Sequence, residues 1–337
     1  MAMDIGIDLG TTKIIVYKHG KGVLLKEPSV VAVNTLENKI VAVGDNALKM
    51  LGKTPGYIKA DYPLKDGVIS DHVLTEVIIK DVIKRSCNSF FIKPRIIVCT
   101  PSVVTDVEKM AIVEAVAKAG ARKVYLIEEP IAAAIGAGID ITKPNGHCIV
   151  DIGGGTADVA VTSLAGVVLS KTLRYAGNRV DEEIMKYFTN VHHISIGKKT
   201  AEQLKKNLAC VYHPDPNEKF TIKGRDLLSG YPKQLEVTQT DIYECVIPFG
   251  EEVVKTVKAV LENTPPELSA DLYENGITMT GGGSLMKGLD KLLEEATKLK
   301  CRIAENPIEC VSIGTGKAFD YIEMFHNGFT NETTYIG

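Results

Sequence analysis

Several features that mark common classes of protein are missing from this sequence of 337 residues. It contains no long basic run, and its formal net charge is −3. Because binding to a phosphate backbone requires clustered lysine and arginine, nucleic acid is excluded as the main partner. No apolar run reaches the roughly 18 residues that a membrane-spanning helix needs. The first strand is predicted within three residues of the amino end, so we expect no signal peptide.

The seven cysteines show neither the CxxC pattern nor the cysteine–histidine spacing of a metal site. Several lie in apolar runs, such as Cys99 at the end of residues 96–99 and Cys148 before two β-branched residues. Cysteine in such a run behaves as a small buried apolar side chain. We therefore predict reduced thiols in a cytoplasmic protein.

The length exceeds the usual size of one hydrophobic core, so two domains with a cleft between them are expected. A loop of Pro144, Asn145 and Gly146 is predicted to separate the halves. Strands are expected near residues 4–8, 14–17, 29–34, 39–43, 95–100, 123–127, 147–151, 158–164, 167–173 and 276–280. Helices are expected near residues 45–51, 71–87, 103–119, 129–137, 179–190, 198–209, 238–263 and 285–300. Helices that follow strands indicate α/β layers.

One motif occurs twice, as GIDLGTTKIIV at residues 6–16 and as IVDIGGGTADVAV at residues 149–161. Each copy is an apolar run ending in aspartate, a glycine-rich turn with threonine, and a β-branched run, which predicts a β-hairpin. Glycine lets the backbone approach a polyanion, and consecutive N–H groups form an anion-binding concavity. Either turn alone could be an ordinary tight hairpin, but the recurrence favours two facing phosphate loops. The predicted phosphate contacts are Gly10, Thr11, Thr12, Gly153, Gly154, Gly155 and Thr156.

Two further predictions follow from the same region and from a third glycine turn. Asp8 and Asp151 each end a strand, where a carboxylate typically binds Mg²⁺ through water while phosphates supply the other oxygens.

The third glycine turn lies between the strand at residues 276–280 and the helical pattern at residues 285–300, which predicts another nucleotide contact. A helix start without a ligand is the alternative. The residues of this turn are Gly281, Gly282, Gly283 and Ser284.

The motifs, in this order, resemble the superfamily of actin, sugar kinases and heat-shock-70 ATPases, and most of all the bacterial actins of the MreB family. The resemblance extends nearly from end to end. The further matching segments are KEPSVVAV (26–33), AVGDNALKMLGKTPG (42–56), PLKDGVISD (63–71), LIEEPIAAAIGAG (126–138), IGKKTAEQLK (196–205), GRDLLSGYPK (224–233), NTPPELSADL (263–272) and SIGTGKAF (312–319).

This resemblance implies an α/β actin-like ATPase fold. Two similar domains, each with a mixed β-sheet flanked by helices and an inserted smaller subdomain, would enclose a nucleotide cleft. The first domain would comprise residues 1–144, with an insertion at 29–65 and a returning carboxy-terminal helix within 313–337, near residues 314–325. The second domain would comprise residues 145–312, with an insertion at 177–238.

The resemblance also implies catalytic residues for ATP hydrolysis. Glu129, which precedes Pro130, would orient the attacking water. From the residues alone, Glu129 could instead be a dipole partner at a helix amino end, and the adjacent Glu128 could exchange roles with it. Thr156 and Asp158 on the second loop would lie within reach of the same water. The family usually has TTE where this chain has TAD, so the carboxylate is shorter by one methylene.

Three other residues are implied to contact the nucleotide. Lys13 stands where the family usually has asparagine, and its ammonium could meet the β-phosphate. A solvated lysine at a strand start is the alternative. Glu202 and Lys205, three residues apart on one helix, would contact the ribose and the base. Without the resemblance, we would interpret them as a surface ion pair.

The segment around Phe90, Phe91 and Ile92 places apolar side chains between basic residues at positions 84, 85, 93 and 95. Such a segment suits insertion into an anionic membrane surface, whereas the sequence alone favours a loop whose aromatic rings pack into the core. The family carries a membrane-inserting loop at this place, which favours the first interpretation. Binding would then depend on filament avidity.

The expected function is that of a cell-shape-determining cytoskeletal ATPase with ATP and Mg²⁺ as cofactors. Such a protein polymerises, in paired protofilaments, on the inner face of the cell membrane and works with the machinery of cell-wall elongation or shape. The alternative is a small-molecule kinase or another ATPase of the superfamily. A heat-shock-70 chaperone would need a peptide-binding domain, for which the chain is too short.

Overall fold

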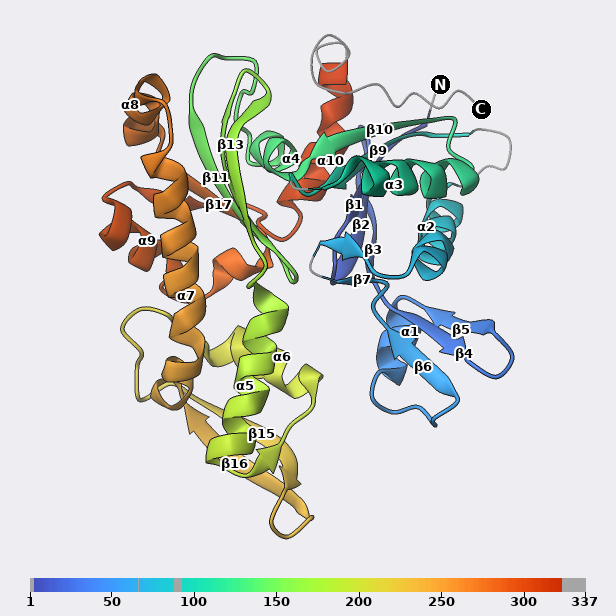
Figure 1. The fold of residues 1–337 in the computed structure, drawn as a ribbon, viewed down its shortest axis with the longest axis vertical. Helices are drawn as coiled ribbons and strands as arrows, with labels where there is room; N and C mark the ends of the chain where they lie inside the picture. The colour runs from blue at the N-terminus through green and yellow to red at the C-terminus, as the bar shows by residue number, and fades with distance from the viewer. Residues whose placement is uncertain (1–2, 66, 88–92, 103, 323–337) are drawn as a thin grey trace.

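A computed structural model describes residues 3–65, 67–87, 93–102 and 104–322 of the chain (Figure 1). Its core consists of two five-stranded mixed sheets. The first sheet has the order β10-β9-β1-β2-β3, with β1 (Asp4–Leu9), β2 (Lys13–Lys18), β3 (Gly22–Pro28), β9 (Arg95–Thr100) and β10 (Lys123–Glu128). The second has the order β13-β12-β11-β17-β18, with β11 (His147–Ile152), β12 (Ala157–Ser163), β13 (Gly166–Leu173), β17 (Ile277–Thr280) and β18 (Cys301–Ile303).

The two sheets are built alike. In the first, β1 is antiparallel to β2 and parallel to β9, and in the second β11 is antiparallel to β12 and parallel to β17. Both central strands are apolar because both of their faces are covered, and Ile5 and Ile149 are completely buried. Each half therefore begins with a hairpin at the centre of its sheet, as the repeated motif predicts.

Helices cover the outer faces of both sheets. The first sheet packs on α2 (His72–Ser86) and α3 (Asp106–Lys118), which contribute Ile78 and Val113 to its core. The second packs on α7 (Gln239–Glu262) and α9 (Leu289–Thr297), and Phe249 of α7 lies in its core. The helix α5 (Gly177–Val191) packs on α7 and adds Phe188 to the same hydrophobic cluster. These layers make the mixed α/β fold that the sequence predicts.

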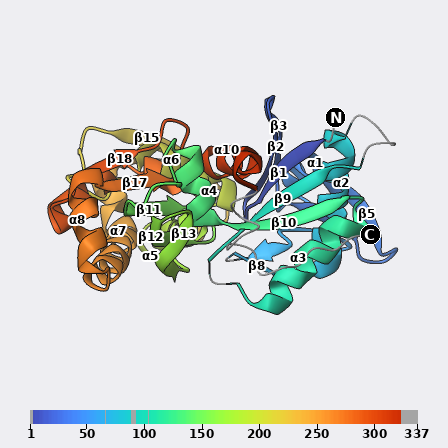
Figure 2. The same ribbon diagram turned by 90° about the horizontal axis from the view of Figure 1, so that it is seen from above.

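Two short helices, α4 (Glu129–Gly136) and α10 (Cys310–Lys317), lie between the sheets (Figures 1 and 2). They cross closely, because a Cβ on Gly314 would lie only 1.7 Å from the carbonyl oxygen of Ala132. The carboxy-terminal helix also packs on the first sheet, where a Cβ on Gly6 would lie 2.5 Å from the nitrogen of Gly316. It is predicted near residues 314–325, but it begins at Cys310 and continues as a 3-10 turn, Ala318–Tyr321.

Two smaller sheets project from the halves on the same side of the molecule (Figure 1). One has the order β5-β4-β6 and lies in the first predicted insertion, with β4 (Val31–Asn34), β5 (Lys39–Val43), α1 (Asp45–Met50) and β6 (Ile58–Asp61). The other has the order β14-β15-β16 and lies in the second, with β14 (Ile194–Ser195), α6 (Lys198–Leu208), β15 (Lys219–Asp226) and β16 (Pro232–Thr238). A short hairpin of β7 (Leu64–Lys65) and β8 (Val68–Ile69) leads back to the first half.

Every strand and helix expected from the sequence overlaps an element of the structure, but the helix predicted at residues 285–300 is placed wrongly. A 3-10 turn, η1 (Gly282–Leu285), follows β17, and α9 begins only after Gly288, whose φ of 80° interrupts the helical backbone. The structure also contains α8 (Pro266–Asn275), β3, β6 and six other strands that the sequence pattern did not predict.

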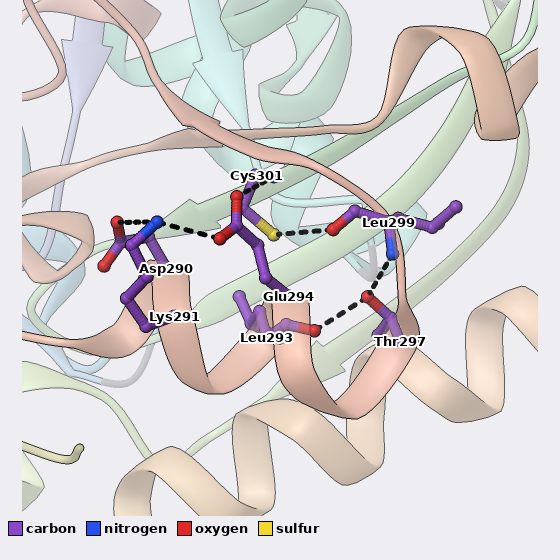
Figure 3. Close-up of polar contacts among 7 residues, drawn as sticks. All are labelled: Asp290, Lys291, Leu293, Glu294, Thr297, Leu299 and Cys301. Carbon is purple, nitrogen blue, oxygen red and sulfur yellow. Dashed lines mark hydrogen bonds and ion pairs between the residues drawn. The ribbon is translucent and has the colours of Figure 1, made fainter. Parts of the chain in front are cut away.

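The end of α9 explains why this helix is also shorter than expected (Figure 3). Lys298 takes the left-handed conformation with a φ of 62°. The hydroxyl of Thr297 then accepts a hydrogen bond from the N–H of Leu299, and the Glu294 carboxylate accepts one from the N–H of Cys301, at 3.1 Å. These side chains satisfy backbone donors beyond the helix end and direct the chain into β18.

Candidate functional site

A cavity of about 460 Å³ lies between the two halves. The three glycine-rich turns converge on it, together with the first residue of α4 and one face of α6. The predicted site residues that line it are Asp8, Gly10, Thr11, Thr12, Lys13, Glu129, Asp151, Gly153, Gly154, Gly155, Thr156, Glu202, Lys205, Gly281, Gly282 and Gly283. Asp158 and Ser284 are buried outside this lining.

The two hairpin turns face one another across the cavity. The β1–β2 ladder closes with the pair Leu9 and Ile14, and the β11–β12 ladder with the pair Ile152 and Ala157. A Cβ on Gly154 would lie 1.9 Å from the hydroxyl of Thr12, so the turns approach too closely for a side chain at that position. The Thr12 hydroxyl is buried and has no hydrogen-bond partner among the described residues, which fits a polar ligand in the cavity.

The third turn packs directly against the second. Gly281 has a φ of 78°, and a Cβ there would lie 2.3 Å from the carbonyl oxygen of Ile152. A Cβ on Gly283 would lie 2.2 Å from the Ile152 side chain. Ser284 donates a hydrogen bond to the Gly281 carbonyl at 2.7 Å and is completely buried, so its hydroxyl supports the turn. The turn reaches the cavity through a 3-10 helix, and α9 begins seven residues after Gly282.

Asp8 and Asp151 occupy equivalent positions in the two halves. Asp8 is paired across β1–β9 with Cys99, and Asp151 across β11–β17 with Thr280. Burial, followed by the charge of Asp151, raises the pKa of Asp8 to about 7. Burial likewise raises the pKa of Asp151 to about 6, although the Thr280 hydroxyl donates to its Oδ1 at 2.6 Å and opposes the rise.

The chemistry of these donors fits a divalent cation. Asp8 is partly buried, Asp151 is buried, and both carboxylates have raised pKa values. A hard cation between them would neutralise their negative charge. Among the described residues, no group of three or more histidine, cysteine, aspartate or glutamate side chains could hold a metal by itself. A cation here would therefore need water or phosphate oxygens to complete its coordination.

Glu129 is the first residue of α4 and faces the cavity, with Pro130 directly after it. Burial raises its pKa well above the ordinary value, and the negative charges of Asp158, Asp151 and Asp8 raise it further. Glu129 is therefore surrounded by carboxylates, an arrangement that would be costly for a residue acting only as a helix-dipole partner.

Asp158 lies in strand β12, behind Glu129, and is only 1% exposed. Its Oδ1 accepts a hydrogen bond from Thr172 at 2.5 Å, and its carboxyl group also forms hydrogen bonds with Thr156 and Glu129. Burial raises its pKa. Asp158 therefore lies in strand β12 and not, as the sequence had led us to expect, on the loop. It contacts Glu129, whereas Thr156 lines the cavity, and the reach of Asp158 to the attacking water stays a prediction.

The structure decides against two alternatives that the sequence left open: a freely solvated Lys13, and a surface ion pair between Glu202 and Lys205. Lys13 begins β2 and lines the cavity, so it is not a freely solvated lysine; burial, followed by the nearby Lys206, lowers its pKa. Glu202 pairs with Lys206 and not with Lys205, which rules out a surface pair between the two residues singled out by the sequence. The ammonium of Lys205 instead lies 2.8 Å from Asp181.

The family description "MreB/Mbl protein" matches residues 2–327. The chain belongs to the MreB/Mbl family. The cell shape-determining protein Mbl of Bacillus subtilis (strain 168) is 46% identical over 323 residues, which cover 96% of this chain and 97% of that protein. The cell shape-determining protein MreB of Escherichia coli (strain K12) is 43% identical over 331 residues, which cover 96% and 95%.

Solved structures of the MreB/Mbl family agree with this assignment. MreB5 of Spiroplasma citri bound to ADP is 36% identical and has a TM-score of 0.91, covering 97% of this chain and 99% of that one. The same protein bound to AMPPNP also has a TM-score of 0.91. A MamK double helical filament, 23% identical with a TM-score of 0.79, shares the fold. The chain is thus a bacterial actin homologue, and the family assignment decides against the small-molecule kinase.

For this MreB/Mbl chain, sequence reasoning missed several residues of the cavity. Asn178 and Asp181 lie in the first turns of α5, directly after the second sheet's hairpin strands. Lys206 could have been found, because Glu202 and Lys206 are four residues apart, the better spacing for a helical ion pair. Outside the cavity lining, Tyr62 in the first small subdomain was also missed, and the ammonium of Lys198 from the second lies 4.9 Å from its ring centroid.

The predicted membrane residues Phe90, Phe91 and Ile92 lie outside the described residues. None of the helices within the described ranges combines the length and the apolar character needed to cross a bilayer.

Proposed function

We propose that this member of the MreB/Mbl family is a filament-forming ATPase that binds Mg-ATP in the cavity between its halves and determines cell shape. The observation that carries the proposal is the convergence of three glycine turns with Asp8, Asp151 and Glu129 on one cavity. The names and bound nucleotides of the relatives support it.

The proposed binding roles follow from the donors that line the cavity. Gly10, Thr11 and Thr12 of the first loop, and residues 153–156 of the second, would donate hydrogen bonds to the phosphates. Lys13 would add positive charge close to them. Asp8 and Asp151 would hold Mg²⁺ through water, which would neutralise phosphate charge. On the other side of the cavity, Glu202 and α6 would face the nucleoside, and the third turn would contact it with its backbone.

For hydrolysis, Glu129 would hold and orient the water that attacks the γ-phosphate. Glu129 lines the cavity, and its hydrogen bond with Asp158 of the second sheet would hold it in position. The negative charges of the neighbouring carboxylates favour the protonated form of Glu129. Glu129 would therefore act as an ionised acceptor for the water only when positive charge in the site compensates these negative charges. Positioning and charge neutralisation supply most of the rate in phosphoryl transfer.

Self-association is proposed from two exposed regions of the second half. The tip of the β15–β16 hairpin exposes Leu228 at 81% and Tyr231 at 73%, beside the basic residues Lys223 and Arg225. At the opposite end of the molecule, α8 exposes Tyr273 at 75% between acidic residues (Figure 1). Complementary surfaces at opposite ends support a head-to-tail contact, which repeats into a filament.

The domain boundaries and the membrane contact are proposed on the sequence and the family. The first domain would comprise residues 1–144 with the returning helix of 313–337, and the second residues 145–312. The packing of α10 against β1 supports the return of the chain. Phe90, Phe91 and Ile92 would attach filaments to the anionic inner face of the cell membrane, where the cell-wall elongation machinery would be the partner.

The proposed reaction is tested by phosphate release from ATP with no second substrate present. We expect continuous release that depends on Mg²⁺ and stops with EDTA. A chain that binds ATP but releases no phosphate at any protein concentration would contradict the proposed ATPase activity.

The proposed membrane contact is tested by replacing both Phe90 and Phe91 with serine. This change should abolish co-sedimentation with anionic liposomes and leave phosphate release unchanged. Persistent liposome binding would place the membrane contact elsewhere.

A further inference from the structure

The amino end of α5 holds the second phosphate loop from behind. The N–H of Gly177 donates to the Gly153 carbonyl at 3.3 Å, and the N–H of Asn178 donates to the Gly154 carbonyl at 2.7 Å. The helix has no side-chain cap among the described residues, since Ala176 is its N-cap. The loop carbonyls therefore satisfy the free donors of the helix end.

These two hydrogen bonds also set the direction of the loop donors. In a planar trans peptide, the carbonyl and the following N–H point in opposite directions. With the carbonyls of Gly153 and Gly154 turned toward α5, the N–H groups of Gly154 and Gly155 point away from it. Both glycines line the cavity, so the orientation of the proposed phosphate donors depends on where the first turn of α5 lies.

That first turn is fixed by a buried ion pair from a different helix. The ammonium of Lys205 in α6 donates to the Gly177 carbonyl at 2.6 Å and lies 2.8 Å from Oδ1 of Asp181, one turn further along α5. The Asp181 side chain is 2% exposed and that of Lys205 is 15% exposed. A Cβ on Gly177 would lie 3.3 Å from both the Lys205 nitrogen and the Gly153 carbonyl oxygen, so the groups are packed closely.

We propose that Asp181 is a positioning residue for nucleotide binding: through Lys205 and Gly177 it holds α5 so that the second glycine loop presents its N–H groups to phosphate. This inference rests on the proposed function of the cavity. It assigns Lys205 a role at the phosphate end, whereas the family resemblance implies a contact with the base. Because Glu202 on the same helix lines the nucleoside side, α6 links the two ends of the ligand.

The test is the affinity of full-length Asp181→Asn for two probes, ADP and adenosine, by calorimetry or by competition with a labelled nucleotide. The substitution keeps the side-chain shape and removes the charge that holds Lys205. We expect ADP affinity to fall about tenfold, the size of one charge-assisted hydrogen bond, with adenosine affinity unchanged. Lys205→Met should give the same pattern, and the double variant Asp181→Asn/Lys205→Met should be no weaker than Lys205→Met.

The control is Glu183→Gln, which removes a negative charge from α5 in surface ion pairs with Arg179 and Lys186. It should leave both affinities unchanged. The proposal is overturned if Asp181→Asn binds ADP as tightly as the unchanged chain. It is equally overturned if Lys205→Met weakens adenosine as much as ADP, because Lys205 would then contact the nucleoside directly.

Removing one partner of a buried ion pair leaves an uncompensated charge that could prevent folding. Melting without nucleotide detects this, and the variant Asp181→Asn/Lys205→Gln, with no charge at either position, then replaces the single variants. The same selective loss of ADP affinity is expected of it, and unchanged ADP affinity overturns the proposal. If the unchanged chain fails to bind ADP, the proposed function itself fails, which is a different outcome.

Discussion

The carboxylates that line the cavity make the stability of the folded protein sensitive to pH. Burial raises the pKa values of Asp8 and Asp151 to about 7 and about 6, above the ordinary value of 3.8. The folded state therefore keeps protons that the unfolded chain loses, and each such proton costs about 1.4 kcal/mol of stability per pH unit. We predict that nucleotide-free protein in EDTA loses stability as pH rises from about 4 to about 7.

Denaturant unfolding at pH 5, 6, 7 and 8 checks this prediction, with Asp8→Asn as the comparison. The variant has one fewer proton to lose, so its stability should fall less steeply between pH 5 and 7. Stability that rises over this range, or an equal slope in Asp8→Asn, would contradict the assigned pKa shift of Asp8. Added Mg-ADP should stabilise the unchanged chain more at pH 7.5 than at pH 5.5, because a cation needs ionised carboxylates.

Glu129 and Glu128 offer a matched pair for testing catalysis. Glu129 faces the cavity, whereas Glu128 is the N-cap residue of α4 and lies outside the cavity lining. Glu129→Gln should retain ATP binding within about threefold while phosphate release falls tenfold or more, because water positioning is lost but the phosphate contacts are kept. Glu128→Gln should keep the normal rate. A rate unchanged by Glu129→Gln, or lost equally in both variants, would reject this assignment.

For single residues, the sequence predicted which residues line the cavity better than it predicted which side chains contact one another. The repeated aspartates and glycines could be recognised because their residue types and order carry the chemistry. The partners of Lys205 and Asp158 could not, because Asp181 and Glu129 reach them from other elements of the chain. Such contacts depend on tertiary packing, which local spacing does not report.

Among the elements, the third glycine turn shows how packing restricts the backbone. Gly281 has a positive φ and would place a Cβ 2.3 Å from the Ile152 carbonyl oxygen, whereas a Cβ on Gly282 would approach nothing closer than 4.0 Å. Gly281→Ala should therefore reduce the free energy of unfolding by about 2 kcal/mol or more, and Gly282→Ala by less than about 0.5 kcal/mol. Denaturant unfolding without nucleotide compares them. Equal effects would contradict the described turn.

The strands and helices that were missed are the ones with a weak apolar signal. β15 and β16 are mostly exposed and polar, with Ile222 and Val237 as their fully buried side chains. The start of α9 was misplaced because Leu285 and Met286 continue an apolar period across Gly288, although the extended backbone of Met286 and the positive φ of Gly288 interrupt the helix. The elements at the centre of the two large sheets were recognisable from periodicity, whereas these two surface strands were not.

At the scale of the whole molecule, Tyr62 and Lys198 join the two small subdomains, because the Lys198 ammonium lies 4.9 Å from the centroid of the Tyr62 ring. An ammonium over an aromatic ring contributes about 0.5–1 kcal/mol at an exposed site. Tyr62→Ala should therefore speed ADP release about threefold, whereas Tyr62→Phe, which keeps the ring, should not. Stopped-flow release of a labelled ADP measures both rates. An equal increase in the two variants would show that the hydroxyl, and not the ring, matters.

The arrangement of the two halves was predictable mainly because the chain repeats itself. The hairpins at residues 6–16 and 149–161 form the centres of two sheets with the same pattern of parallel and antiparallel pairs. The return of α10 to the first sheet has no local signal, since the tight approach of Gly316 to Gly6 joins residues 310 positions apart. The return of this helix was predicted only from the resemblance to the MreB family.

The central claim, a nucleotide-dependent filament, is tested most directly by pelleting and electron microscopy with ATP, with ADP and without nucleotide. Leu228→Ser/Tyr231→Ser serves as the comparison, because it removes exposed side chains of the β15–β16 hairpin that do not line the cavity. We predict that the unchanged chain pellets as filaments with ATP, while the variant binds ATP but stays in the supernatant. An unchanged chain that binds and hydrolyses ATP yet remains soluble at every concentration would contradict the account.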